Sequence, residues 1–99
     1  MADFSSIIRS NVPTLVDFYA DWCGPCQRFH QTLDQVKQHF KDSLTVIKIN
    51  VDKNAKASNA FKIRSVPTLI CFQSGEILWR IKGTLTKQEL INKITQSMK

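Results

Sequence analysis

Two hydrophobic spacings follow one another in the first half of the chain. Residues 14–20 form an apolar run of strand length that contains one acid, Asp17, a pattern typical of a strand covered on both faces. In residues 26–40 the apolar side chains recur at steps of three or four, as on one face of a helix. This stripe consists of Cys26, Phe29, Leu33, Val36 and Phe40. We therefore predict a buried strand followed by a long amphipathic helix.

The segments around this unit predict a second strand and two short helices. Residues 44–51 read as a strand, and Asn54 is placed to cap a helix that runs through residue 61, because its side chain can accept from the first amides. Residues 4–10 have room for one or two helical turns. These turns should end before Pro13, since proline disfavours a helical conformation in the residue before it.

The last third of the chain predicts a hairpin and a closing helix. Residues 68–72 and 77–81 are strand-like and flank a polar turn that contains Gly75. Thr86 and Glu89 have the spacing of a capping box, in which each side chain bonds the backbone amide of the other residue. The helix that follows carries four apolar residues on one face, Leu90, Ile91, Ile94 and Met98.

Together these elements predict an α/β fold with a mixed sheet. Two strands joined through a helix pair in parallel by a right-handed crossover, and the hairpin adds antiparallel strands. Helices should therefore cover both sides of the sheet. The strand at residues 44–51 should lie at an edge, where Lys48 and Lys53 discourage pairing with another chain. We expect a monomer, with dimerisation through this edge as the alternative.

Length and composition narrow the class of protein. A chain of 99 residues with 42% hydrophobic and 22% charged residues is expected to form one domain, residues 1–99, around one core. No stretch approaches the roughly 20 apolar residues that a membrane span needs. The amino terminus also lacks the basic start and apolar run of a secretory signal. We therefore expect a cytosolic protein that does not enter membranes.

The formal net charge is +6, and the basic excess lies in the second half of the chain. These basic residues are spread over many turns and are not interleaved with aromatic residues, as they are in a nucleic-acid platform. We interpret them as a solvated face and expect no nucleic-acid partner. A surface for an acidic partner is the alternative.

Three cysteines are an odd number for a disulfide-stapled secreted scaffold, but Cys23 and Cys26 have the C-x-x-C spacing of a redox pair or a metal site. They stand where the first strand turns into the long helix, and amides at a helix start stabilise a thiolate. Cys26 continues the helix stripe and should face the core. Cys23 precedes the regular helix and is the expected exposed nucleophile.

Other interpretations of the cysteines remain open at this point. The pair could pack as small hydrophobic side chains, or it could bind zinc with His30 and His39. However, His39 should point roughly away from the pair, and the chain has no second C-x-x-C. Cys71 alternates with Leu69 on a predicted strand and is expected to be a buried packing residue without a catalytic role.

The sequence resembles the thioredoxin family across residues 12–98. The resemblance rests on Val16-Asp17-Phe18, on Trp22-Cys23-Gly24-Pro25-Cys26 and on Val66-Pro67-Thr68. It implies a thioredoxin fold and dithiol–disulfide exchange without a cofactor or a metal. In that exchange Cys23 attacks a protein disulfide, and Cys26 then attacks Cys23 to release the reduced substrate.

The resemblance also implies roles for residues outside the cysteine motif. Asp17 shares a strand face with Leu15, and a desolvated carboxylate there should have a raised pKa and accept the proton of Cys26; a wet edge strand is the alternative. Lys48 aligns with the lysine partner of this aspartate, or is simply solvated. Val66-Pro67 resembles the family's cis-proline loop, with a trans turn as the alternative. The residues that match the family's substrate surface are Trp22, Gly24, Pro25, Ser65, Val66, Gly83 and Thr84.

The sequence departs from the family pattern in three places. No strand precedes residue 14, so we expect a four-stranded sheet without the usual first edge strand. Gln27 stands where a basic residue is common, although Arg28 and His30 lie nearby. Gln31 replaces a proline within the long helix, which should therefore run without a kink.

The hypothesis that follows is a cytosolic protein-disulfide reductase that carries electrons for redox homeostasis. The resemblance implies disulfide-containing protein substrates and an NADPH-dependent thioredoxin reductase as the electron donor. A disulfide isomerase or oxidase is the alternative within the same chemistry. A binding module that uses the apolar surface around Trp22 and Val66 and leaves its thiols idle is the alternative from another class.

Overall fold

The computed structural model describes residues 3–99 and has a four-stranded mixed sheet in the order β2-β1-β3-β4. β1 (Thr14–Tyr19) pairs in parallel with β2 (Thr45–Asn50) and antiparallel with β3 (Thr68–Gln73). β3 pairs antiparallel with β4 (Glu76–Lys82). The predicted sheet composition is confirmed, and β2 lies at an edge as expected.

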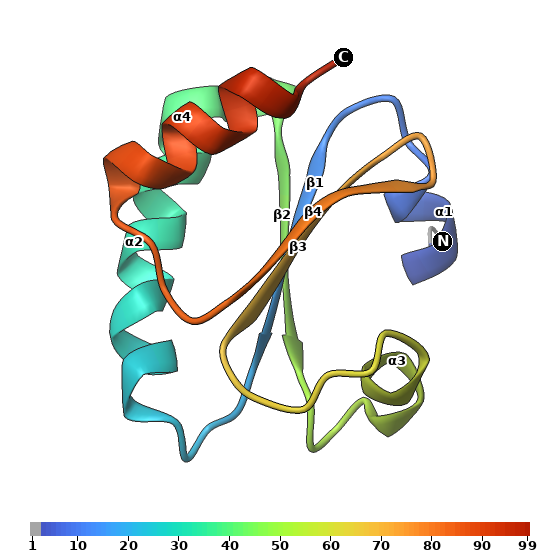
Figure 1. Ribbon diagram of the computed structural model, residues 1–99, viewed down its shortest axis with the longest axis vertical. Coiled ribbons are helices and arrows are strands. Elements are labelled where there is room, and N and C mark those ends of the chain that lie inside the picture. The colour runs from blue at the N-terminus through green and yellow to red at the C-terminus, as the bar shows by residue number, and fades with distance from the viewer. Residues whose placement is uncertain (1–2) are drawn as a thin grey trace.

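The helices cover both faces of the sheet (Figure 1). α2 (Gly24–Phe40) and α4 (Lys87–Ser97) lie together on one side, and α1 (Phe4–Ile8) and α3 (Ala55–Ala60) lie on the other. A single 3-10 turn, Lys41–Ser43, follows α2. α2 is one continuous helix of 17 residues, as the glutamine in place of the family's proline predicts.

The core has two parts because β1 is covered on both faces. Leu15 packs in a cluster with side chains of α2 and α4, whereas Val16 and Phe18 pack in a second cluster below α1 and α3. Successive side chains of a strand point to opposite faces. Asp17 therefore lies on the same face as Leu15, under α2. This double cover explains why the strand reads as one apolar run rather than as an alternation.

Local interactions set the ends of the elements. The capping box is present, with the Thr86 side chain accepting from the amide of Glu89 and the Glu89 carboxylate accepting from the amide of Thr86. Ser74 and Gly75 both have positive φ, 54° and 82°, as a two-residue hairpin turn requires.

One predicted cap is wrong. Asn54 occupies the N-cap position of α3, but its side chain makes no capping bond. Instead its amide nitrogen donates to the backbone oxygen of Asn50 at 2.9 Å. The side-chain oxygen of Asn50 accepts from the amides of Asp52 and Lys53. The turn between β2 and α3 is thus organised around Asn50, and the Asn54 side chain is recruited to it.

We expect Leu33→Ala to lower the free energy of unfolding by about 2–5 kcal/mol, because Leu33 is fully buried between α2 and the sheet. Urea denaturation measures the change. Gln35→Ala on the exposed face of the same helix is the matched control and should change stability by less than about 0.5 kcal/mol. Equal losses in the two variants would contradict the assigned core.

Candidate active site

The turn between β1 and α2 places a disulfide at the start of the helix. Cys23 is the N-cap residue of α2, and its Sγ accepts from the backbone amide of Cys26 at 3.2 Å. Pro25 stands in the first helical turn, where its missing N–H costs no hydrogen bond. Cys23 and Cys26 are joined, with their Cα atoms 5.3 Å apart. The Cys26 amide therefore donates to the sulfur that would carry a negative charge after reduction.

The two sulfurs differ in accessibility in the predicted order. Cys26 is fully buried, and Cys23 is 6% exposed. Cys23 is nevertheless far less exposed than the sequence suggests, because Tyr19, Val51 and Val66 pack against the disulfide. Its Sγ lies 3.9 Å from the backbone oxygen of Val66. Access to Cys23 is therefore limited to a small opening beside the loop of Val66.

Two shallow hollows flank the disulfide and bring together most of the expected substrate residues. One, of about 120 Å³, contains Trp22, Val51, Ile63, Arg64, Ser65 and Val66. The other, of about 200 Å³, contains Pro25, Arg28, Phe29, Thr32, Thr84 and Leu85. Gly83 lies in neither, but its amide donates to the backbone oxygen of Pro67 at 2.8 Å. Gly24 is the first residue of α2.

Trp22 projects over the first hollow with 72% of its surface exposed. Its indole Nε1 donates to Oδ2 of Asp52 at 3.0 Å. Trp22 follows β1 and Asp52 follows β2, and the carboxyl ends of parallel strands meet at the same edge of a sheet. The sequence analysis missed Asp52. Its position directly after the second strand was the signal that could have identified it.

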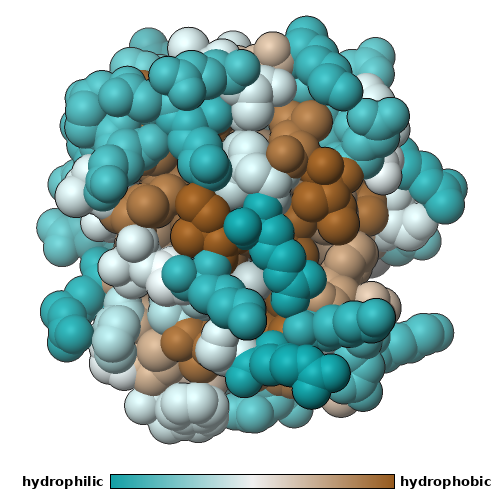
Figure 2. Space-filling model, in the orientation of Figure 1, coloured by the Kyte–Doolittle hydropathy of each residue, from teal (hydrophilic) through white to brown (hydrophobic). Residues whose placement is uncertain are grey.

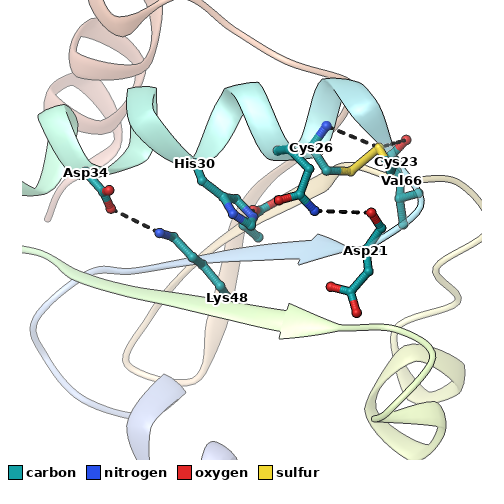
Figure 3. Close-up of polar contacts among 9 residues, drawn as sticks. Asp21, Cys23, Cys26, His30, Asp34, Lys48 and Val66 are labelled. Carbon is teal, nitrogen blue, oxygen red and sulfur yellow. Dashed lines mark hydrogen bonds and ion pairs between the residues drawn. A yellow bond between two sulfur atoms is a disulfide. The ribbon is translucent and has the colours of Figure 1, made fainter.

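The peptide bond between Val66 and Pro67 is cis, as predicted. Within residues 3–99 neither the amide nor the carbonyl of Val66 has a backbone partner. The loop lies directly beside the sulfur of Cys23 (Figure 3). An extended segment of another protein could therefore pair with the backbone of Val66 next to the disulfide.

Asp17 is fully buried, and the expectation of a desolvated carboxylate is confirmed. Burial raises the pKa of Asp17 to about 7, with Lys48 acting in the opposite direction. Neither carboxylate oxygen has a hydrogen-bond partner within the described part of the chain. The alternative of a wet edge strand is wrong, because β1 is a central strand with α2 above it.

Lys48 does not form an ion pair with Asp17. The two residues are neighbours in the β1–β2 register, but Nζ of Lys48 lies 3.0 Å from Oδ1 of Asp34 (Figure 3). The Asp34 side chain is 68% exposed. The ammonium therefore pairs with a hydrated carboxylate and avoids the desolvation that a move toward the buried acid would cost.

The side chain that lies beside Asp17 is His30. Its Nε2 is 3.3 Å from Oδ2 of Asp17, and its ring packs edge-on against Tyr19 with centroids 4.7 Å apart. The sequence analysis noted His30 as a nearby titratable group and as a possible zinc ligand, but not as a neighbour of Asp17. Its position one residue after Phe29 in the helix stripe was the signal that it faces β1.

The structure assigns no reactive role to Cys71 and shows no metal-binding cluster or membrane-spanning helix among residues 3–99. Burial raises the pKa of the Cys71 thiol to about 12, so the side chain packs in the core as expected. Among residues 3–99 no cluster of three or more His, Cys, Asp or Glu side chains is placed to hold a metal ion. Over the same residues, no helix combines the length and the apolar character needed to cross a bilayer.

Hydrophilic side chains dominate the periphery of the face shown in Figure 2, and the hydrophobic ones gather in separate smaller patches. The disulfide region carries Arg28 beside one hollow and Arg64 beside the other. Each of the two hollows beside the disulfide thus carries one basic side chain.

Comparison with known proteins identifies relatives of this chain. The family model described as Thioredoxin matches residues 1–96. Chloroplastic thioredoxin Y1 of Arabidopsis thaliana is 42% identical over 93 residues, which are 94% of this chain and 54% of that protein. A thioredoxin of Haemophilus influenzae is 38% identical over 96% of this chain and 90% of its own length.

Two further matches add a fused relative and a solved structure. A bifunctional thioredoxin reductase/thioredoxin of Mycobacterium leprae is 38% identical over 93% of this chain, which corresponds to 20% of that protein. The structure of a mutant thioredoxin from Halobacterium salinarum superposes with a TM-score of 0.88 at 31% identity, covering 100% of this chain and 86% of the other.

We expect Asp17→Asn to raise stability increasingly between about pH 4 and pH 7, and by a constant amount above that range. Folded Asp17, with a pKa of about 7, keeps its proton where the unfolded chain has lost it, so wild-type stability falls by about 1.4 kcal/mol per pH unit there. Urea denaturation across this range measures the difference. The exposed Asp21→Asn is the control and should show no such slope. A pH-independent difference would contradict the desolvated acid.

Proposed function

We propose that this chain, which belongs to the thioredoxin family and is a protein-disulfide reductase, reduces disulfides of cytosolic proteins through Cys23 and Cys26. The observation that carries the proposal is the disulfide at the amino-terminal end of α2, where the Cys26 amide donates to Sγ of Cys23. Two electrons pass from the reduced pair to the substrate. No cofactor takes part within this chain.

Cys23 is the proposed nucleophile. The helix start stabilises its thiolate through the Cys26 amide and the macrodipole. The thiolate attacks one sulfur of the substrate disulfide, a mixed disulfide forms, and the second substrate sulfur leaves as a thiolate that takes a proton from water. Gln27 supplies no cation here, whereas Arg28 lines the adjacent hollow.

Cys26 is the proposed resolving cysteine. It is fully buried beside Cys23, so it is protected from other disulfides until the mixed disulfide has formed. Its thiol must lose a proton before it can attack. Asp17 is the proposed acceptor, since a base is most effective when its pKa lies near the working pH. Lys48 acts on Asp17 only through its field, because its ammonium is paired with Asp34.

The proposed substrate surface surrounds the disulfide. The unpaired backbone of Val66, turned by Pro67, would bond an extended substrate segment as a short strand does. Trp22 and Ser65 border the segment on one side, and Pro25 and Thr84 border it on the other. Gly83 leaves room for its backbone, since a side chain there would meet no atom within 4 Å, whereas one at Gly24 would contact the Arg28 side chain at 3.6 Å.

A thioredoxin reductase that draws on NADPH is the proposed electron donor. The Mycobacterium leprae relative is named as a bifunctional thioredoxin reductase/thioredoxin, which supports this pairing. Reduction of substrates requires a compartment that keeps thiols reduced, which supports the cytosol. We propose that the chain works as a monomer.

We expect Cys26→Ser to accumulate a mixed disulfide between Cys23 and a purified disulfide-bonded test protein. The variant keeps the attacking thiol and lacks the resolving one. Non-reducing electrophoresis detects the adduct, and dithiothreitol should reduce it and separate the two proteins. Cys23→Ser should form no adduct, and Cys71→Ser should behave as wild type because its thiol is buried and inert. An adduct in Cys23→Ser alone would reverse the two roles.

The reduction potential tests the direction of electron flow. We expect a value below about −240 mV, near the roughly −270 mV of thioredoxins, because that value favours electron donation to cytosolic disulfides. Equilibration in dithiothreitol redox buffers, followed by thiol counting and by the fluorescence of Trp22, measures it. A value above about −200 mV would favour an oxidase or isomerase instead. A chain that showed no titration would favour the thiol-idle binding module.

A further inference from the structure

The buried acid of the site requires an accompanying base. Burial holds the pKa of Asp17 at about 7, so a large share of the molecules carry a protonated carboxyl at neutral pH. A protonated carboxyl cannot accept the proton of Cys26 unless it loses its own. Asp17 has no exposed surface, and neither of its oxygens has a hydrogen-bond partner among residues 3–99. Its proton therefore needs a protein group through which it can leave.

His30 is the group in position to take that proton. Its Nε2 lies 3.3 Å from Oδ2 of Asp17, and this nitrogen is itself buried without a hydrogen-bond partner. The His30 side chain is 22% exposed. Since Nε2 is buried, the exposure belongs to the rest of the ring. The imidazole thus connects the enclosed carboxyl to the surface, and the edge-on contact with Tyr19 fixes its orientation.

We propose that Asp17 and His30 act as one base in the resolving step. The carboxyl of Asp17 accepts the Cys26 proton on one oxygen while its own proton passes from Oδ2 to Nε2 of His30. The inference rests on the proposed function of the cysteine pair. His30 touches neither substrate nor sulfur; it acts through Asp17.

The step balances in atoms and electrons. The S–H bond of Cys26 breaks, and the Sγ–Sγ bond to Cys23 forms. The bond between Cys23 and the substrate sulfur breaks, and the substrate leaves with the electron pair as a thiolate. His30 becomes an imidazolium and returns to the neutral form by losing a ring proton to water, and exchange with water restores the tautomer with a free Nε2 before the next cycle.

The surroundings of His30 favour its neutral form, which can accept a proton and pass it on. Burial lowers the pKa of His30 below its ordinary value, Lys48 on β2 acts in the same direction, and Asp34 on α2 opposes it. Asp17 and Tyr19 face the ring from β1. The imidazole is therefore neutral near pH 7 and free to accept a proton. The 3.3 Å separation of Nε2 and Oδ2 allows direct transfer of a proton between the two side chains.

A stopped-flow experiment isolates this step. The reduced protein is mixed with 5,5′-dithiobis(2-nitrobenzoic acid), and the coloured thiolate is released once by the attack of Cys23 and again by the attack of Cys26. The second release is followed from about pH 5.5 to 9 in wild type, His30→Phe, His30→Gln, Asp17→Asn and the double variant Asp17→Asn/His30→Phe. His30→Phe keeps a ring against Tyr19. The exposed His39→Phe on the same helix is the matched control.

The expected result is a difference in pH profile. The second release should stay nearly constant down to about pH 6 in wild type and His39→Phe. In both His30 variants it should fall below about pH 7, by about tenfold at pH 6, because only ionised Asp17 can then accept the proton. The four proteins should converge above about pH 8.5. In the Asp17→Asn background the change at His30 should alter the rate by less than about twofold.

Three outcomes would overturn the inference. Identical profiles in wild type and both His30 variants would exclude His30 from the step. A loss that is equal at every pH, or equal in the Asp17→Asn background, would assign His30 a purely structural role. Failure of the proposed function is distinct from these, since wild type would then release no second thiolate.

Discussion

Burial of β1 on both of its faces is the constraint on which the site depends. The strand lies at the centre of the sheet between β2 and β3, with α2 on one face and a second apolar cluster on the other. Any polar side chain within it must lose its water. Asp17 is such a side chain, and its pKa of about 7 follows directly from its place in the strand. The same strand ends where the chain must turn into α2, and this turn holds the cysteine pair.

The edge formed by the carboxyl ends of β1 and β2 gathers the remaining parts of the site. Parallel pairing brings the residues after both strands together, which is why Asp52 holds the indole of Trp22. The loop before β3 approaches from the other side and lays Val66 against Cys23. The accessible surface around the sulfur is thus assembled from three segments that are distant in sequence. It combines the start of α2, where amides stabilise a thiolate, with the backbone of Val66, which is free to bond another chain.

Burial acts on two titratable groups of the core with opposite consequences. The Cys71 thiol has a pKa near 12, stays protonated and serves only packing. The carboxyl of Asp17 is moved to the range where proton transfer at neutral pH is effective. Desolvation raises both pKa values, and the difference arises from their ordinary values. The pKa of a carboxyl rises from the acidic range to about 7, whereas that of a thiol rises from about 9 to about 12, further from neutral pH. The neighbouring His30 gives Asp17, unlike Cys71, a basic partner at 3.3 Å.

The sequence by itself determined the order of strands and helices, the mixed sheet and the identity of the reactive pair. These depend on local spacing: the stripe that ends in Cys26, the hairpin turn at Gly75 and the capping box at Thr86 are each read within a few residues. The side-chain partners were not predictable in this way. Lys48 pairs with Asp34 rather than with Asp17, and the Asn54 side chain bonds Asn50 rather than capping its helix. The nearness of Cys23 to Val66 and of Asp17 to His30 likewise depends on how α2 and the loops pack on the sheet. Only the tertiary structure decides such contacts, because the partner of a flexible side chain depends on the distances to several neighbours and on the cost of desolvation. Both are set only when the helices and strands have packed together.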